Sequence, residues 1–287
     1  VDSLNIGIVA LTVLATISAY TLRTFRWMLL LNHQQKPTTF LIAFSSLMYG
    51  YLINLGIPRL GEISRAGAIN KQNKKSFPFT LGTILIERLI DVSTLALLLL
   101  LYSLMFSNIL STFFEEQIAS KLHALPNISH WLWVPSFLII ALMSNWLIKK
   151  YSNKIKKQFF TFKNGILTVK NIPNKTLFGL LTLGIWLSYF LTSSLCFFSF
   201  NHQYNLGFTA AISVLILGSV ARSIPIQGGS IGVFHTAITA VLTLSIFGVD
   251  KQTAFTISFV IHAIQTIFQI LAGLVSFAFL TISSAKR

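Results

Sequence analysis

Two segments that contain glycine and proline interrupt a chain made largely of long apolar stretches. One lies around residues 57–67 (IPRLGEISRAG) and the other around 224–232 (IPIQGGSIG). In a bilayer every backbone amide needs a partner inside the protein, so broken helices at membrane depth occur only where they line a cavity or are buried. A pair of such breaks, one in each half of the chain, indicates a transporter-type binding site.

The apolar stretches between these breaks predict a polytopic, all-α bundle with one domain over residues 1–287. The chain is 54% hydrophobic and 10% charged, whereas soluble domains have about 25% charged residues. A span needs roughly 18 or more apolar residues. Such runs occur at 4–31, 79–106, 131–148, 176–199 and 253–282.

Two further stretches, 38–70 and 207–248, are predicted to be re-entrant hairpins of broken helices. In the first, the leg 59–70 rises only about 18 Å, which is too short for a hydrocarbon core of about 30 Å. In the second, each leg is just long enough to span, so two short spans remain an alternative. The symmetry of the whole order favours re-entry. Repeat A (about 4–106) and repeat B (about 176–282) would be inverted-topology repeats, joined by a linking helix at 131–148 and a basic loop at 149–175.

The net charge of +15 is read through the positive-inside rule, which places basic loops in the cytoplasm. Sixteen of the 22 basic residues lie at 23–36, 71–75, 149–175 and the C-terminus, and the loop 149–175 holds eight lysines. This pattern indicates a cytoplasmic membrane face and argues against a nucleic-acid partner. Two connections, 109–122 and 154–167, are predicted to be amphipathic interfacial helices. Cys196 is the only cysteine, so an intramolecular disulfide is excluded.

Charged residues inside predicted membrane segments are costly and usually functional. Glu87 and Asp91 are four residues apart and share a helix face. Two interpretations stay open. The charges form structural pairs, such as Glu62 with Arg65 and Glu87 with Arg88 or an arginine of the first hairpin. Alternatively, arginine forks and free N–H groups at the broken helices bind an anionic lipid headgroup, while the acids hold an amine or a coupling proton.

The candidate site therefore combines the charges with the two breaks and with a histidine that follows the second break. No catalytic residue, metal ligand or cofactor is predicted. The substrate-binding candidates are Arg59, Glu62, Arg65, Glu87, Arg88, Asp91, Arg222, Gly228, Gly229, Gly232 and His235, and the structural breaks are Gly56, Pro58, Gly61 and Pro225.

Four stretches resemble the lysylphosphatidylglycerol synthase transmembrane family, a flippase-like domain. They are LRTFRWMLLLN (22–32), IPRLGEISRAGAI (57–69), IERLIDV (86–92) and IPIQGGSIGVFHTA (224–237). The resemblance implies a stand-alone flippase-like module and marks Arg26 in addition to the candidates above. Gln227 stands where members often have a second proline, and His235 is near a position where they often have glutamate. Members often carry one more N-terminal helix, which is consistent with a chain that starts late.

The function expected from these observations is translocation of an anionic or aminoacylated phospholipid, or lipid-phosphate, headgroup across the bacterial inner membrane, without enzymatic activity. A first alternative is an intramembrane transferase or hydrolase that acts on a lipid-linked substrate through Glu87 and Asp91. A second is a non-transporting subunit that recruits a cytoplasmic enzyme. The expected partner is membrane phospholipid, with a homodimer or a cytoplasmic lipid-modifying enzyme as further partners.

Overall fold

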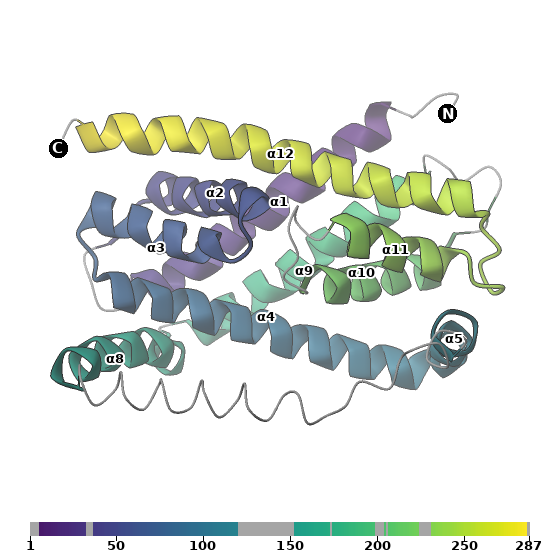
Figure 1. Ribbon diagram of the computed structural model, residues 1–287, viewed down its shortest axis with the longest axis horizontal. Helices are drawn as coiled ribbons and strands as arrows, with labels where there is room; N and C mark the ends of the chain where they lie inside the picture. The colour runs from purple at the N-terminus through teal and green to yellow at the C-terminus, as the bar shows by residue number, and fades with distance from the viewer. Residues whose placement is uncertain are drawn as a thin grey trace, which may run out of the picture.

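The computed structural model describes residues 6–32, 37–119, 152–172, 174–198, 204, 206–223 and 231–285. Within these ranges the regular structure is entirely helical, which confirms the all-α fold class. The α-helices are α1 (Ile6–Leu31), α2 (Phe40–Gly56), α3 (Leu60–Asn73), α4 (Phe77–Met105), α5 (Ser107–Phe113), α8 (Ser152–Leu167), α9 (Lys175–Phe198), α10 (Phe208–Ser223), α11 (Ile231–Leu242) and α12 (Lys251–Ala285) (Figure 1). A π-helical turn, η1 (Phe114–Ala119), follows α5, and a 3-10 turn, η3 (Thr168–Asn171), follows α8.

Three helices, α1, α9 and α12, are long and apolar enough to cross a membrane. A fourth candidate span is α4 taken together with Ser107–Gln117, which is bent by 99° from it. These four coincide with predicted spans, and the predicted span 131–148 lies outside the described residues. Leu104 and Val275 are 72% and 71% exposed, which suits side chains that face lipid. The chain is therefore a multi-pass membrane protein.

The first predicted break separates two short helices that pack closely. The helix α2 ends at Gly56 and α3 begins at Leu60. The Gly61 N–H donates to Asn54 Oδ1 over 2.7 Å, and a Cβ placed on Gly61 would lie 2.1 Å from the Gly50 carbonyl oxygen. A side chain at Gly61 would therefore separate the two helices. The second break falls between α10 and α11, and residues 224–230, with Pro225, Gly228 and Gly229, lie outside the described residues.

The four long helices enclose the two short pairs. The helices α1 and α9 pack along each other through the centre, while α4 and α12 flank them on opposite sides (Figure 1). The pair α2–α3 contacts α12 and α4 near one end of the molecule. The pair α10–α11 contacts α9 and α12 near the other end. This arrangement leaves the middle of the bundle bordered by both pairs.

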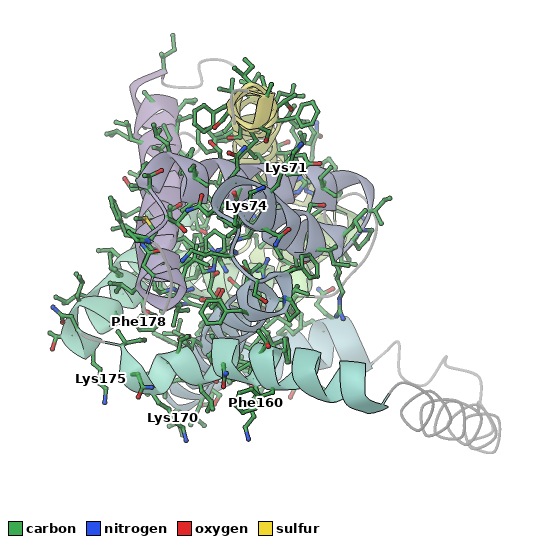
Figure 2. The ribbon with its side chains drawn as sticks, turned by 90° about the vertical axis from the view of Figure 1, so that its left-hand side faces the viewer. Lys71, Lys74, Phe160, Lys170, Lys175 and Phe178 are labelled. Atoms are coloured by element: carbon green, nitrogen blue, oxygen red, sulfur yellow. The ribbon has the colours of Figure 1, made fainter. Side chains whose placement is uncertain are left out.

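Basic side chains gather at the end of the molecule where α8 lies. Lys71, Lys74, Lys170 and Lys175 are all found there (Figure 2). The predicted amphipathic segment 154–167 is confirmed as a helix, α8, which packs on α4 where Gly82 and Gly165 meet. The segment predicted at 109–122 forms α5 and η1 over its described part.

Candidate functional site

Six of the seven arginines of the chain lie in the bundle, together with three of its seven acids. Arg23 and Arg26 come from α1, Arg65 and Glu62 from α3, and Glu87, Arg88 and Asp91 from α4. The turn between α2 and α3 carries Arg59, and the last turn of α10 carries Arg222. The arginines divide into a buried ion-pair cluster and a set that faces a cavity.

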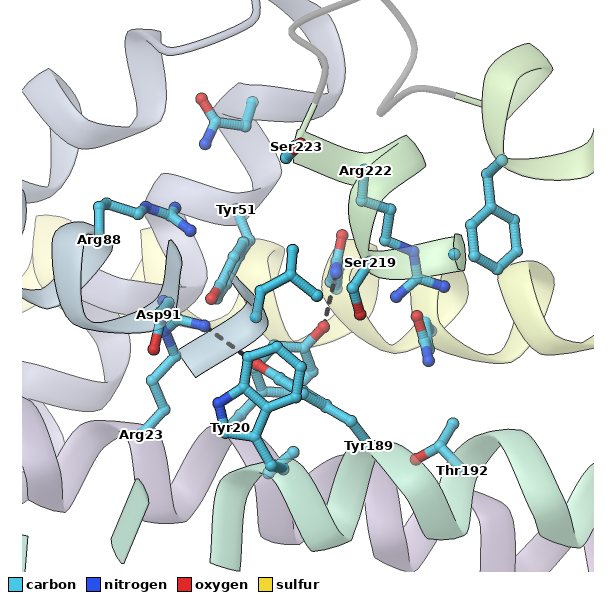
Figure 3. A pocket seen from close by; sticks show the side chains of 18 of the residues that line it. Tyr20, Arg23, Tyr51, Arg88, Asp91, Tyr189, Thr192, Ser219, Arg222 and Ser223 are labelled. Atoms are coloured by element: carbon cyan, nitrogen blue, oxygen red, sulfur yellow. Dashed lines mark hydrogen bonds and ion pairs between the residues drawn. The ribbon is translucent and has the colours of Figure 1, made fainter. Parts of the chain in front are cut away.

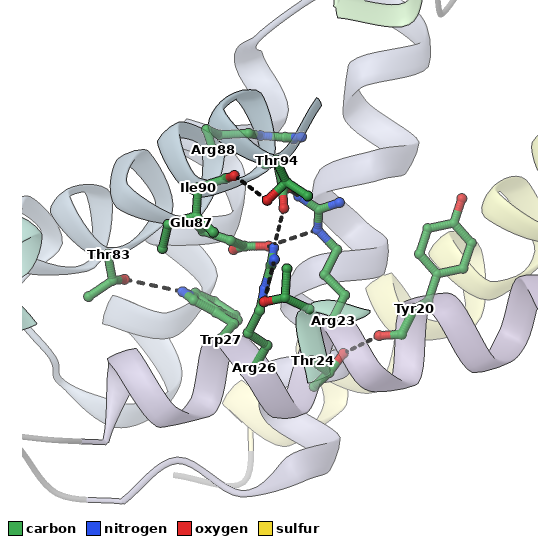
Figure 4. Close-up of polar contacts among 12 residues, drawn as sticks. Tyr20, Arg23, Thr24, Arg26, Trp27, Thr83, Glu87, Arg88, Ile90 and Thr94 are labelled. Carbon is green, nitrogen blue, oxygen red and sulfur yellow. Dashed lines mark hydrogen bonds and ion pairs between the residues drawn. The ribbon is translucent and has the colours of Figure 1, made fainter. Parts of the chain in front are cut away.

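Glu87 is the centre of the buried cluster and has no exposed surface. Its Oε1 accepts from Arg23 Nε and its Oε2 from Arg65 Nη2, each over 2.7 Å. Arg26 Nη2 lies 3.7 Å from Oε1. A carboxylate that holds two arginines by charge-assisted hydrogen bonds fixes α1, α3 and α4 in one arrangement. Figure 4 shows the Arg23 side of this cluster.

Asp91, one turn beyond Glu87 on α4, extends the cluster to the edge of the cavity. Its Oδ1 accepts from Arg26 Nη2 over 2.5 Å, and its Oδ2 accepts from Arg23 Nη2. The Arg23 Nη1 also donates to the Tyr189 hydroxyl on α9 over 3.0 Å. Arg23 therefore joins the carboxylates of α4 to the opposite half of the bundle.

The cluster is closed on its far side by an aromatic ring. The Arg65 guanidinium lies 3.5 Å from the centre of the Trp27 ring. The Trp27 Nε1 donates to Thr83 Oγ1 over 3.1 Å (Figure 4). Cation–π stacking of this kind is worth about 2 kcal/mol where water is excluded. Arg65 and Glu87 are thus parts of a packed wall rather than of an open surface.

Glu62 and Arg88 form a separate ion pair that is accessible. Arg88 Nη2 lies 3.1 Å from Glu62 Oε1, and the side chains are 38% and 25% exposed. Glu62 Oε2 has no hydrogen-bond partner among the described residues. Accessible pairs contribute little, about 0–1 kcal/mol, so this pair can open at small cost.

A cavity of about 740 Å³ lies between the two halves of the bundle. Helices α1, α2, α3, α4, α9, α10, α11 and α12 all contribute to its wall. Its middle position follows from Tyr20, Asp91, Trp186 and Gln269, which are near the midpoints of α1, α4, α9 and α12. The polar and aromatic lining residues include Tyr20, Arg23, Tyr51, Asn54, Arg59, Glu62, Arg88, Asp91, Trp186, Tyr189, Ser219, Arg222, Gln265 and Gln269.

Arg222 is the cation of the second half that faces this cavity. Its guanidinium lies 4.1 Å from the centre of the Phe234 ring, and the residue is exposed. Among the described residues no carboxylate lies within ion-pair distance of it. Figure 3 shows Arg222 and Ser219 on one side of the cavity, Arg88 and Asp91 on the other, and Tyr20 and Tyr51 between them.

The structure brings together only some of the residues singled out in the sequence. Those that line the cavity are Pro58, Arg59, Glu62, Arg88, Asp91 and Arg222. Arg65 and Glu87 are buried behind it, and Glu62 pairs with Arg88 rather than with Arg65. Gly56, Gly61 and Gly232 are described but do not line it, and Pro225, Gly228 and Gly229 are outside the described residues.

His235 also lies away from the cavity wall, on the face of α11 that packs against α12. Its Nδ1 is 2.9 Å from Ser258 Oγ, and its ring centre is 5.2 Å from that of His262. His235 is 8% exposed. These contacts indicate a packing role in the α11–α12 interface.

Several cavity residues were not singled out in the sequence. Arg23 was assigned with Arg26 to the cytoplasmic end of the first span, and this is wrong, because the two residues are 4% and 0% exposed inside the bundle. The spacing could have indicated this, since the two arginines are three positions apart and share a helix face. The hydroxyl of Tyr20 accepts from Gln269 Nε2 over 2.5 Å, and nothing in the sequence predicts that pairing.

Comparison with known proteins identifies one family. The sequence model of the lysylphosphatidylglycerol synthase TM region matches residues 1–273. No curated protein and no solved structure matches the chain. The family match covers every charged residue of the site and confirms the resemblance drawn from the four motifs.

Proposed function

Because the chain belongs to the lysylphosphatidylglycerol synthase TM region family, a group of membrane lipid-related proteins, we propose that it is a lipid translocase. It would move an anionic or aminoacylated phospholipid, or lipid-phosphate, headgroup across the bacterial inner membrane. The observation that carries this proposal is the arginine-lined cavity at the middle of the long helices, which in a membrane would lie near the mid-bilayer depth. Charged groups at that depth are tolerated where they serve a substrate path.

The arrangement of the helices supports two inverted repeats. The order α1, α2–α3, α4 has a counterpart in α9, α10–α11, α12, each with two long helices around a short pair. A half-turn about the viewing axis of Figure 1 exchanges α1 with α9 and α4 with α12. The contacts follow the same exchange, because α2 packs on α12 and α10 packs on α4. Each short pair would then be a re-entrant hairpin that enters from its own side of the membrane.

In the proposed mechanism the headgroup enters the cavity between the hairpins while the acyl chains stay in the bilayer. Arg222 and Arg59 bind the phosphate, since neither has a carboxylate partner among the described residues. The cluster of Arg23, Arg65 and Glu87 keeps the first half rigid. Rocking of one repeat against the other then exposes the cavity to either leaflet in turn.

The end that carries Lys71, Lys74, Lys170 and Lys175 is proposed to face the cytoplasm. Anionic lipids of that leaflet would bind α8. This basic surface is also where a cytoplasmic lipid-modifying enzyme would bind, and a homodimer is a second proposed assembly.

We also propose that the chain is not an enzyme. The enzymatic alternative needs Glu87 or Asp91 as a base or metal ligand. Both oxygens of each carboxylate accept hydrogen bonds from arginines, so neither carboxylate has an oxygen free to take a substrate proton or to bind a metal ion. Metal-dependent turnover of a lipid phosphate by the purified protein would contradict this.

The proposal is tested with proteoliposomes that hold a phospholipid labelled on its acyl chain, by following the accessibility of inner-leaflet label to a membrane-impermeant quencher. The wild type is expected to expose that label, and Arg222→Gln to slow the exposure by about tenfold or more, because a hydrogen bond to a charged group is worth about 1.5–3 kcal/mol. The matched control is Lys251→Gln, which removes an exposed charge outside the cavity. A wild type no faster than protein-free vesicles would overturn the proposal, as would an unaffected Arg222→Gln.

A further inference from the structure

The charges of the cavity are unbalanced in a way that bears on which headgroup it accepts. Six arginines against three carboxylates, Glu62, Glu87 and Asp91, give this set of nine side chains a net charge of +3. Counted over the cavity lining alone, four arginines face two carboxylates, which leaves +2. A ligand that balances this excess must carry negative charge.

No other acid of the chain compensates these arginines within the described residues. Glu116 accepts a hydrogen bond from Ser245, and Asp250 accepts one from Tyr204. Glu115 lies beside Glu116 in η1. Asp2 is the only acid of the sequence outside the described residues.

The carboxylates that face the cavity are already engaged. Asp91 gives one oxygen to Arg26 and the other to Arg23, and Glu62 gives Oε1 to Arg88. The one carboxylate oxygen of the lining without a partner is Glu62 Oε2. A substrate ammonium group bound there would lie next to the Arg88 guanidinium, and like charges in contact cost several kcal/mol.

The remaining polar groups of the lining suit a neutral, hydroxylated moiety. Ser219 and Gln265 have side chains that donate and accept hydrogen bonds, and both face the cavity. The rings of Tyr51 and Trp186 add flat surfaces to the wall. Arg222, stacked on Phe234, presents a planar fork that matches two phosphate oxygens.

From this charge pattern we propose that the cavity selects phospholipid headgroups that are net anionic and lack an ammonium group, such as a phosphomonoester or a phosphate ester of a polyol. The phosphate binds Arg222 and Arg59, and aminoacylated and other ammonium-bearing headgroups are disfavoured. This inference rests on the proposed function for the site and narrows its substrate class.

The experiment measures binding without transport. The purified chain in detergent is heated with short-chain phosphatidic acid, phosphatidylglycerol, phosphatidylethanolamine or lysylphosphatidylglycerol, and unfolding is followed by tryptophan fluorescence. Phosphatidic acid and phosphatidylglycerol are expected to raise the melting temperature. The two ammonium-bearing lipids are expected to need more than about tenfold higher concentration for the same shift. Equal or stronger stabilisation by lysylphosphatidylglycerol would overturn the inference.

For Glu62→Gln, the direction of the change in lipid affinity tests the proposal. The substitution releases Arg88 and makes the cavity more positive, so apparent affinity for phosphatidylglycerol is expected to rise. If Glu62 instead recognised a substrate amine, the variant would bind lysylphosphatidylglycerol more weakly and leave phosphatidylglycerol unchanged, which would refute the proposal. Arg222→Gln is expected to abolish the anionic shift, and Lys251→Gln, which removes an exposed charge outside the cavity, to preserve it.

Two further arms separate this inference from the translocase proposal and from a soluble-phosphate site. Selective anionic binding in a protein that does not accelerate lipid exposure would contradict the translocase and support the selectivity. Faster exposure of lysylphosphatidylglycerol than of phosphatidylglycerol would support the translocase and contradict the selectivity for headgroups without an ammonium group. Glycerol phosphate is expected to cause no shift, and stabilisation by it equal to that by phosphatidylglycerol would overturn a lipid site.

Discussion

Glu87→Gln is the substitution that best separates the structural charges from those of the cavity. Glu87 is completely buried and accepts hydrogen bonds from Arg23 and Arg65, with Arg26 also within ion-pair distance of it. Glutamine keeps the shape and one acceptor oxygen but removes the charge. Three buried guanidinium groups are then left with Asp91 as their only anion.

The size of the effect follows from the burial of the cluster. Breaking a buried ion pair from one side costs about 3–5 kcal/mol, because the remaining charge stays desolvated. Glu62→Gln removes the same charge from a pair that is 25% and 38% exposed, where the cost is about 0–1 kcal/mol. We therefore expect Glu87→Gln to destabilise the protein by about 2 kcal/mol or more beyond Glu62→Gln.

The assay is thermal unfolding of the detergent-solubilised protein followed by tryptophan fluorescence. Glu115→Gln is the matched control, because Glu115 is exposed in η1. Glu87→Gln is expected to lower the melting temperature by on the order of 10 °C. A second substitution, Arg65→Gln, is expected to return part of that loss by restoring the charge balance. Equal melting temperatures for Glu87→Gln and Glu62→Gln would refute the assignment of Glu87 to a packed wall.

Three further predictions concern the first hairpin and the start of α12. Gly61→Ala is expected to destabilise the protein by about 1–3 kcal/mol, because the alanine Cβ would lie 2.1 Å from the Gly50 carbonyl oxygen. The control is Gly56→Ala, which has open space around the added Cβ and should leave the melting temperature unchanged. Arg59 has φ 65°, a backbone conformation that glycine adopts easily, so Arg59→Gly is expected to retain the stability of the protein within about 1 kcal/mol. The same variant is expected to slow lipid exposure. A normal rate of lipid exposure would count against a role of Arg59 in phosphate binding. Asp250 accepts hydrogen bonds from the Tyr204 hydroxyl and from N–H groups of the first turn of α12, which lowers its pKa. The stability it provides is therefore present above about pH 4 and lost as pH falls through its lowered pKa. Asp250→Asn should accordingly flatten the acid side of the melting curve against pH, and an unaltered curve would contradict this.

The helix positions and the first break were predictable because they depend on local sequence. The thickness of the bilayer sets the length of an apolar run that spans it, and proline and glycine mark where a helix ends. The run 4–31 became α1 at Ile6–Leu31, and 253–282 became α12 at Lys251–Ala285, since an apolar stretch of that length has few alternatives. The break at Pro58 follows from the missing backbone N–H of proline and from the leg 59–70, which is too short to span.

Which charges pair with each other was predicted only in part. The pair of Glu87 with an arginine of the first hairpin is confirmed by Arg65, whereas the pair of Glu62 with Arg65 is wrong, because Glu62 pairs with Arg88. Helix spacing places Glu87 and Asp91 on one face but does not say which neighbour packs there. Arg23 and Arg26 were assigned to the cytoplasmic end because the positive-inside rule reads position along the chain and not burial. Lys75 was also assigned to a cytoplasmic loop, but it is 2% exposed and its Nζ donates to the Leu31 carbonyl over 2.9 Å. The burial of these three basic residues depends on contacts between helices that are far apart in the sequence.

In the proposed function, the cavity at the middle of the long helices holds a lipid phosphate on Arg222. An electron cryomicroscopy map of the chain in phosphatidylglycerol nanodiscs tests it most directly. We expect density for a phosphate within hydrogen-bond distance of the Arg222 guanidinium, continuous with acyl chains that lead out of the cavity into the bilayer. A cavity closed by side chains, or filled with ordered water alone while Arg222 binds a protein carboxylate, would contradict it.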